Sequence, residues 1–515
     1  MLPLLAVLFY LSQHGEEWVH LRKTVLPGYL KNTLILLLSV IALALVLGVP
    51  TAWFISAFNF PGRRFFSWAL VLPLSIPSYV GAFVYYELVD GAIPLLIWIR
   101  THHGVDAFFA AETGIRYGLL IILLSSVLTP YVFLGARAAF LLQGRELLEA
   151  SRCLGACPRE TFFRVALPLA RPGIVAGAAL VGMEVINDYG AVHFFGVPTL
   201  TEGIFRTWFG MGDKTSALRL AGIVMICVLV LLAVERLLRG RARYVTSETS
   251  PRPLARRELK RGSGWGVFLL CLVPLTLGFL YPVVQLILWA IPQLSSGTTP
   301  FPSVEAVLRG TGAALATAFV VTILASLFVY AVRLEQSKLR SSLEKVATLG
   351  YAIPGAVVAV GVMAVTGSFD RLQIPGIPIV GGTVAAIGFA YFVRFFAIPC
   401  QFSRSAFERI GEGVEESSRL LGRPPLATFL KIDLPLIRGS LAAAAVLLFV
   451  DLLKELPLTM ILRPPNFETL ATSAFSLAKE ARLHACSVPS LLIVAIGGCG
   501  LILMNRWMMG GRHHE

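Results

Sequence analysis

The sequence is 515 residues long, 56% hydrophobic and only 14% charged, with a mean hydropathy of +0.76. Soluble domains carry about 25% charged residues, so this composition excludes a soluble enzyme, a disordered chain and a disulfide-stapled secreted domain. The net charge of +14 is expected to mark cytoplasmic loops and not a nucleic-acid interface. The composition therefore predicts an all-α polytopic membrane protein surrounded by lipid.

Apolar stretches near the roughly 20 residues that cross a bilayer recur along the chain in two sets. The first set comprises residues 33–58, 65–88, 118–142, 172–189 and 220–238. The second set comprises residues 266–291, 312–332, 343–366, 381–402, 439–460 and 486–507. Between them, residues 239–264 are rich in Arg, Ser and Pro, which favours a solvated cytoplasmic linker. We expect two transmembrane repeats, residues 1–238 and 265–515.

The apolar N-terminus is too short to be a complete first helix. Residues 2–11 would rise only about 15 Å, half the hydrocarbon thickness. We expect the natural start to lie upstream, with the first helix truncated here, so that the plan is six plus six, or about twelve, helices. A signal peptide is disfavoured because no basic flank precedes this stretch and no small-residue cleavage site follows it.

The two halves share polar residues in register, which indicates an internal repeat. Adding 267 to the numbers from Glu149 to Arg171 matches twelve of twenty-three residues without a gap, including Glu149 with Glu416, Gly155 with Gly422 and Pro168 with Pro435. Apolar helices share Leu and Ala by composition, but they do not share Glu, Gly and Pro in register. The matched loops fall on a side that carries 29 basic residues against 13 opposite. That side is predicted to be cytoplasmic, together with both termini.

Each repeat loop is expected to form a short helix, a break at Gly155 or Gly422, and a second segment. The second segment is expected to stop at Leu167–Pro168 or Leu434–Pro435, because proline interrupts helices. Such an element can insert its apolar residues into a groove on a partner. The alternative is an amphipathic helix that lies on anionic lipid.

The loop resembles the signature of permease subunits in binding-protein-dependent ATP-driven importers: Glu-Ala-Ala, three residues, Gly, nine residues, then Ile-x-Leu-Pro. Both copies fit, with Ser151, Ser417–Ser418 and Val165 as departures. The resemblance implies the MetI-like type I importer fold in a bacterial inner membrane and a coupling helix that docks into the ATPase subunit. The residues that inherit this role are Glu149, Ala150, Gly155, Leu167, Pro168, Glu416, Gly422, Leu434 and Pro435.

Two further stretches resemble the fused two-half permeases of ferric iron importers. They are Asn187-Asp188-Tyr189-Gly190 with HFFGVPTLTEGIFRTWFGMGD, and Lys454-Glu455-Leu456-Pro457 with LRPPNFETLA. The resemblance implies that ferric iron, delivered by a periplasmic or lipid-anchored binding protein, crosses by alternating access. Thiamine, phosphonate or another small solute is the alternative substrate.

Four acidic residues follow the repeat loops. Glu184 and Asp188 lie four apart, as do Asp451 and Glu455, so each pair occupies one helical face, and the offset of 267 relates the pairs. A carboxylate within a membrane requires a partner or a use, and Fe(III) is a hard ion suited to carboxylate oxygen. We expect these residues to line the translocation path, with Pro77 and Pro354 as helix breaks near it. The alternative is that the acids pair with Lys454, Arg394 or Arg206 or cap helix ends, and that the prolines are packing kinks.

An ATP-driven transporter needs a phosphate-binding loop, yet none of the nine lysines here follows a glycine, so G-x-x-x-x-G-K-[ST] is absent. We therefore expect no enzyme activity, no cofactor and no firmly assigned metal site in this chain. Two copies of a separate cytoplasmic ATPase would use the ATP and Mg²⁺. A secondary transporter and a channel or scaffold remain alternatives, although neither needs two matching docking loops.

Overall fold

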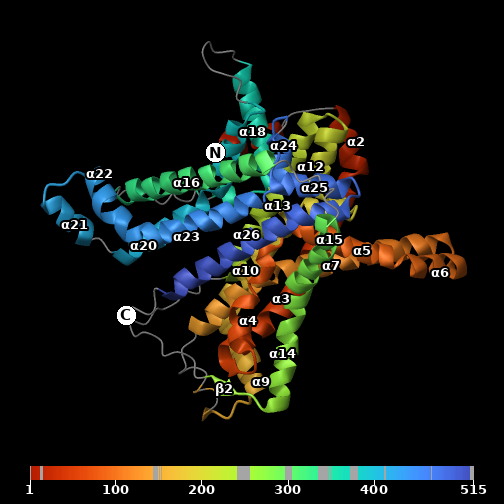
Figure 1. Ribbon diagram of the computed structural model, residues 1–515, viewed down its shortest axis with the longest axis horizontal. Helices are drawn as coiled ribbons and strands as arrows, with labels where there is room; N and C mark the ends of the chain where they lie inside the picture. The colour runs from red at the N-terminus through yellow and green to blue at the C-terminus, as the bar shows by residue number, and fades with distance from the viewer. Residues whose placement is uncertain are drawn as a thin grey trace. The chain divides into compact units, whose positions relative to one another are not determined.

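The computed structural model describes residues 2–11, 16–142, 149, 151, 153–239, 256–295, 304–334, 347, 349–371, 381–410, 413–465 and 467–510 (Figure 1). These residues are almost entirely helical. The elements up to the middle of the chain are α1 (Leu2–Leu11), α2 (Glu16–Thr24), α3 (Leu26–Ala57), β1 (Phe58–Asn59), α4 (Arg63–Ala69), η1 (Leu72–Ser75), α5 (Ser78–Gly91), α6 (Ile93–His103), α7 (Val105–Leu142), α9 (Pro158–Glu160), η2 (Thr161–Ala166), α10 (Leu167–Asn187), α11 (Gly190–Phe194), α12 (Leu200–Phe205), η3 (Arg206–Gly210) and α13 (Lys214–Arg239).

The second part of the chain repeats this succession of long and broken helices. Its elements are β2 (Arg257–Glu258), α14 (Arg261–Leu275), η4 (Thr276–Leu280), α15 (Tyr281–Ser295), α16 (Val304–Leu334), η5 (Leu349–Ala352), α18 (Gly355–Asp370), α19 (Val384–Phe395), α20 (Ala397–Ile410), α21 (Gly413–Leu420), α22 (Pro425–Thr428), η6 (Phe429–Asp433), α23 (Leu434–Leu453), α24 (Pro457–Leu462), α25 (Leu470–Lys479) and α26 (Leu483–Gly510).

Eight helices in the described ranges are long and apolar enough to cross a membrane. Two bent pairs, Arg63–Ser75 with Ser78–Gly91 and Val384–Phe395 with Ala397–Ile410, raise that number to ten if each pair is one span. Leu2–Leu11 and Gly355–Asp370 are shorter apolar helices. Each predicted segment overlaps one of these helices or pairs. The predicted all-α polytopic fold is confirmed, and the chain is a multi-pass membrane protein.

The helices pack into two compact units whose boundaries differ from those of the sequence repeats. The first comprises residues 16–203 and 226–297, and the second comprises residues 1–15, 204–225 and 298–515. The division into repeats at 1–238 and 265–515 with a linker at 239–264 stays a prediction about sequence organisation. Most of that linker, residues 240–255, lies outside the described residues.

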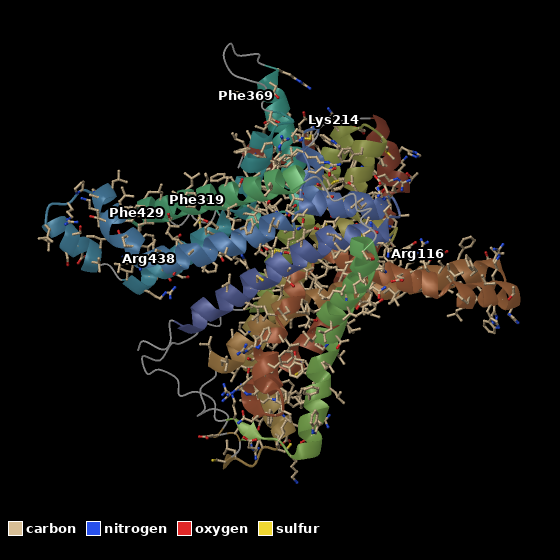
Figure 2. All side chains as sticks on the ribbon, in the orientation of Figure 1. Arg116, Lys214, Phe319, Phe369, Phe429 and Arg438 are labelled. Carbon is tan, nitrogen blue, oxygen red and sulfur yellow. The ribbon has the colours of Figure 1, made fainter. Side chains whose placement is uncertain are left out.

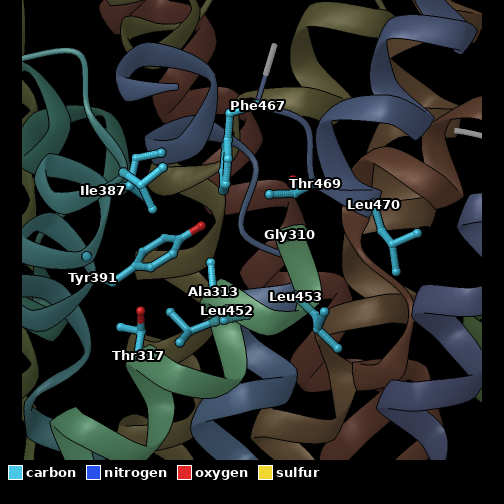
Figure 3. Close-up of a pocket in the computed structure, with 13 residues that line it drawn as sticks. Gly310, Ala313, Thr317, Ile387, Tyr391, Leu452, Leu453, Phe467, Thr469 and Leu470 are labelled. Atoms are coloured by element: carbon cyan, nitrogen blue, oxygen red, sulfur yellow. The ribbon is translucent and has the colours of Figure 1, made fainter. Parts of the chain in front are cut away.

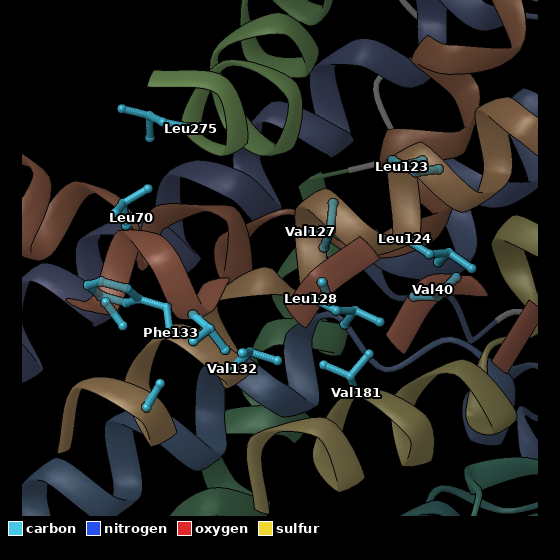
Figure 4. Packing of buried hydrophobic residues seen from close by; sticks show 14 of the residues in the cluster. Val40, Leu70, Leu123, Leu124, Val127, Leu128, Val132, Phe133, Val181 and Leu275 are labelled. Atoms are coloured by element: carbon cyan, nitrogen blue, oxygen red, sulfur yellow. The ribbon is translucent and has the colours of Figure 1, made fainter. Parts of the chain in front are cut away.

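The first unit includes the opening helix of the second half. α14 packs beside α3, α4 and α7, and Cys271 and Leu275 join the buried core drawn in Figure 4. The Tyr85 hydroxyl donates to the Leu277 carbonyl at 2.8 Å. Just before α14, strand β2 pairs with β1 in parallel. Burial of apolar side chains from both halves, at about 25 cal/mol per Å², holds this helix in the first unit.

The second unit contains the corresponding exchange, because α1 packs along α18. A Cβ on Gly361 would lie 2.5 Å from the Pro3 carbonyl oxygen, so glycine permits this close approach. The opening helix of each half therefore packs with the body of the other half.

Candidate functional site: the repeat loops and the carboxylates behind them

The two repeat loops fold alike at every described backbone break. Gly155 and Gly422 have φ of +85° and +74°, a left-handed conformation that favours glycine. The next residue in each loop donates its N–H five residues back, from Ala156 to Ser151 at 3.1 Å and from Arg423 to Ser418 at 3.2 Å. The breaks predicted at the two glycines are confirmed.

A hydroxyl pair closes each loop. The side chains of Ser151 and Thr161 are hydrogen-bonded at 3.2 Å, and those of Ser418 and Thr428 at 2.7 Å. Both pairs obey the offset of 267. The Ser151 departure from the small-residue motif therefore contributes a contact that alanine lacks.

The helix does not stop at the Leu-Pro pairs, and that prediction was wrong. Leu167 and Leu434 begin α10 and α23, with Pro168 and Pro435 in the first turn. A π-helical turn precedes each helix, and Leu167 and Leu434 donate their N–H groups five residues back, to Phe162 and Phe429. Proline has no N–H to lose and its φ suits a first helical turn, so it is tolerated at such a position.

Large apolar side chains project from the same positions in both loops. Leu154 and Leu421 are 88% and 79% exposed. Two further pairs related by 267, Phe163 with Leu430 and Leu169 with Leu436, are also exposed. Matching exposed anchors on a helical element are the kind of surface that a groove on a partner accepts.

An aromatic triad ties each loop to the transmembrane helices. In the first unit, Trp53 on α3 lies 5.1 Å from Phe140 on α7 and 5.2 Å from Phe162 on η2. In the second unit, Tyr330 of α16 lies 6.0 Å from Phe407 of α20 and 5.0 Å from Phe429 of η6, and Phe429 is labelled in Figure 2. Such ring pairs contribute about 0.5–1.5 kcal/mol each beyond their buried area. Each loop is thus in ring contact with two transmembrane helices that precede it in the chain.

The remaining motif residues lie at the start of each loop. Glu149 is helical and half-buried, and Glu416 on α21 is exposed. Ala150 lies outside the described residues. The sequence does not reveal the aromatic triads, because their rings come from separate elements of an apolar chain and look like ordinary core residues.

Asp188 is the C-cap of α10 and lies two residues before the start of α11. Its Oδ1 accepts from the Ala191 and Val192 N–H groups at 3.0 and 3.1 Å, and the Ser78 hydroxyl donates to Oδ2. The carboxylate is buried. Asp188 thus caps a helix end, which is the alternative role expected for these acids. Its carboxylate also faces the N-terminus of α5.

Glu455, the equivalent of Asp188, occupies the same place behind α23. The Leu458 N–H donates to its Oε1 at 3.1 Å, and Arg394 Nη1 lies 2.7 Å from that oxygen. A Cβ on Gly355 would lie 2.0 Å from Arg394 Nη1. Serine stands beside the carboxylate in the first half, whereas glycine leaves room for an arginine in the second.

Pro77 and Pro354 follow the 3₁₀ turns η1 and η5 and serve as the N-caps of α5 and α18. At Pro77 the helix turns by 90°, so these prolines are breaks and not mild kinks. The residue after each proline, Ser78 or Gly355, approaches the carboxylate of its own unit. In each half, the helix break at the proline therefore lies next to a carboxylate that is more than a hundred residues away in the chain.

The other two acids differ from this pair. Asp451 lies 2.8 Å from Lys454, and Glu184 is half-buried in α10. Within the described ranges, no three His, Cys, Asp or Glu side chains are grouped so as to hold a metal ion. A small pocket in the second unit is lined by residues of α16, α19 and the end of α23 (Figure 3). Its wall includes Tyr391, whose hydroxyl is hydrogen-bonded to Thr459 at 2.6 Å.

The chain is similar in sequence to known membrane transport proteins. Residues 44–244 match the model of the binding-protein-dependent transport system inner membrane component. The chain is 27% identical to the Fe(3+)-transport system permease protein FbpB 2 of Haemophilus influenzae over 93% of its own length and 89% of the relative's. This chain is a two-half permease of the binding-protein-dependent importers. The family resemblance noted in the sequence is therefore confirmed.

Other relatives of this permease carry different names. It is 29% identical to the sulfate transport system permease protein CysW of Escherichia coli, over 31% of this chain and 53% of the relative. It is 27% identical to the molybdate/tungstate transport system permease protein WtpB of Methanocaldococcus jannaschii, over 46% and 92%. The permease is an inner-membrane protein of a transport system that includes an ATPase and a solute-binding protein.

Proposed function

We propose that this permease moves ferric iron inward by alternating access. Two copies of a cytoplasmic ATPase engage the loops around Gly155 and Gly422, and closure of that pair draws the loops together and opens the helices outward. Hydrolysis resets them. The permease has no cofactor of its own, ATP and Mg²⁺ act on the partner, and both of its termini are cytoplasmic.

The observation that carries this proposal is the duplicated loop. The paired exposed anchors, Leu154 with Leu421 and Phe163 with Leu430, suit a partner with two-fold symmetry. A secondary transporter and a channel have no use for two such anchors. The aromatic triads behind the loops provide a route for force into α3, α7, α16 and α20.

Iron is favoured over other solutes by the similarity to an Fe(3+) permease along nearly the whole chain. Sulfate and molybdate permeases match shorter stretches, and thiamine or phosphonate is a further alternative. We propose that Asp188, Glu455, Glu184 and Asp451 offer transient oxygen ligands along the path, near the breaks at Pro77 and Pro354.

The test uses vesicles that carry the permease with its ATPase and a solute-binding protein. We expect ATP-dependent uptake of Fe(III) and none of sulfate, molybdate or thiamine. The variant L154E/L421E should lose the ATPase and all uptake, because charges replace both apolar anchors, while the permease itself stays folded. Full uptake by that variant would overturn the coupling proposal. Uptake of another solute in place of Fe(III) would overturn only the proposal that the substrate is iron.

A further inference from the structure

The two halves differ in length between the proline break and the repeat loop. Trp53 and Pro77 match Tyr330 and Pro354 with an offset of 277, whereas Phe140 matches Phe407 with an offset of 267. The first half therefore carries ten additional residues between Pro77 and Phe140. That interval forms the hairpin of α5 and α6 against the first part of α7. In Figure 1, α5 and α6 extend away from α3, α4 and α14 of the same unit.

The end of this hairpin lies beyond a level of charged residues. On α7, Arg116 and Glu112 form an ion pair of 2.6 Å, and Asp90 is exposed at the end of α5. Charged groups are costly in hydrocarbon, so in the proposed orientation this level would lie at the outer boundary of the membrane, opposite the repeat loop that follows α7. The 11 residues of α6 rise about 16 Å further, more than the thickness of one headgroup layer.

Beyond that level the hairpin exposes large apolar side chains. They are Ile93, Leu95, Ile97 and Trp98 on α6, with Val105 and Phe109 on α7. Basic groups border them at the tip, where His102 stacks on Trp98 at 4.7 Å and Arg100 lies over the Phe108 ring. An exposed apolar patch with a polar rim marks an interaction site.

The insertion on one half identifies the kind of partner. A symmetric ATPase pair meets two equivalent loops, but a partner that binds once meets the two halves unequally. A solute-binding protein that delivers to one path binds once, and it does so on the outer side. We propose that the α6–α7 hairpin tip docks the solute-binding protein, through an apolar surface on that protein bordered by acidic residues that face Arg100, His102 and His103.

This inference rests on the proposed function, and the experiment separates the two. The reconstituted complex is assayed for ATPase activity as the solute-binding protein is titrated. Stimulation of the wild-type complex establishes the importer and does not depend on the hairpin variants. In I97E/W98E, we expect the half-stimulating concentration to rise at least about tenfold, since central aromatic anchors dominate such interfaces, while basal ATPase activity stays unchanged.

The matched control is F369E, which replaces an exposed aromatic residue near the end of α18, the helix of the second half that corresponds to α5. It should titrate like the wild type. An unchanged half-stimulating concentration in I97E/W98E would overturn the proposal. So would an equal shift in F369E.

A photo-crosslinking residue at position 97 distinguishes the protein partner from the bilayer. We expect crosslinks to the solute-binding protein that disappear when it is omitted. Crosslinks to lipid alone, unchanged by adding the binding protein, would place the tip in the membrane and overturn the proposal.

Discussion

Arg394 and Glu455 form an ion pair of 2.7 Å in the interior of the second unit, with side chains only 8% and 7% exposed. The pair links α19 to the start of α24 and lies against Gly355, the first residue of α18. The first half holds its equivalent carboxylate with a neutral serine instead. Around these carboxylates the two halves are therefore alike in backbone and unlike in charge.

Removal of one partner of this pair should destabilise the protein. R394M leaves Glu455 buried without its cation, and we expect a loss of about 3–5 kcal/mol, measured by thermal unfolding of the purified permease in detergent. The double variant R394M/E455M should regain most of that loss, because no unpaired buried charge is then left at this site. Equal stability of R394M and wild type would contradict this account.

Gly355 should tolerate no side chain. G355A places a methyl group against Arg394 and Glu455, and we expect a loss of about 1–3 kcal/mol from overpacking. The control is G367A in the same helix, where an added Cβ meets nothing within 4 Å; it should be neutral or slightly stabilising. Thermal unfolding compares the two, and equal melting temperatures would show that the ion pair moves aside freely.

The negative charge of Asp188 can be separated from its hydrogen bonds. D188N keeps an oxygen for the Ala191 and Val192 N–H groups but removes the charge, so we expect correct assembly and at least about tenfold slower Fe(III) uptake if an oxygen anion serves the ion. S78A removes one hydrogen bond and keeps the charge, so uptake should stay near the wild-type rate. Wild-type uptake by an assembled D188N variant would remove Asp188 from the path.

The two docking loops should contribute unequally to binding of the ATPase. At equivalent positions the first loop exposes Cys153 and Arg159, while the second exposes Leu420 and Leu426. Burying a leucine is worth about 1.5–3 kcal/mol. We therefore expect L420C/L426R to weaken ATPase binding by at least about tenfold, measured by titration of the purified ATPase. The reciprocal variant C153L/R159L should strengthen it, and no change in either would show that these positions lie outside the interface.

The aromatic triads should be needed to transmit movement from the loops to the helices, but not for binding of the ATPase. F429A leaves the exposed anchors of its loop in place but removes the ring that contacts Tyr330. We expect ATPase binding to persist while the ratio of solute moved to ATP hydrolysed falls severalfold. Simultaneous measurement of uptake and phosphate release gives that ratio. An unchanged ratio would mean that force reaches the helices by another route.

Local features of this permease could be read from its sequence. The positions of the membrane segments follow from apolar length, since a bilayer imposes the same requirement on every crossing. The sequence predicts about twelve helices, and eight to ten of those in the described residues are long and apolar enough to span. The breaks at Gly155 and Gly422 follow from glycine's access to left-handed φ. The equivalence of the loops follows from polar identities at a fixed offset. Each of these properties depends on residues close together in the chain.

Tertiary structure alone decided which distant residues meet. Arg394 was one of several cations available to the acids, and only packing of α19 against α24 brought it to Glu455. The exchange of α1 and α14 between the halves depends on surfaces that are equally apolar on all sides. The sequence predicts a helix end at Pro168 and Pro435. In the structure the helix continues through both prolines, because a π turn upstream is held by ring contacts to other helices. In an apolar chain, local patterns identify the helices, but the choice of neighbours lies in shape and in a few buried charges.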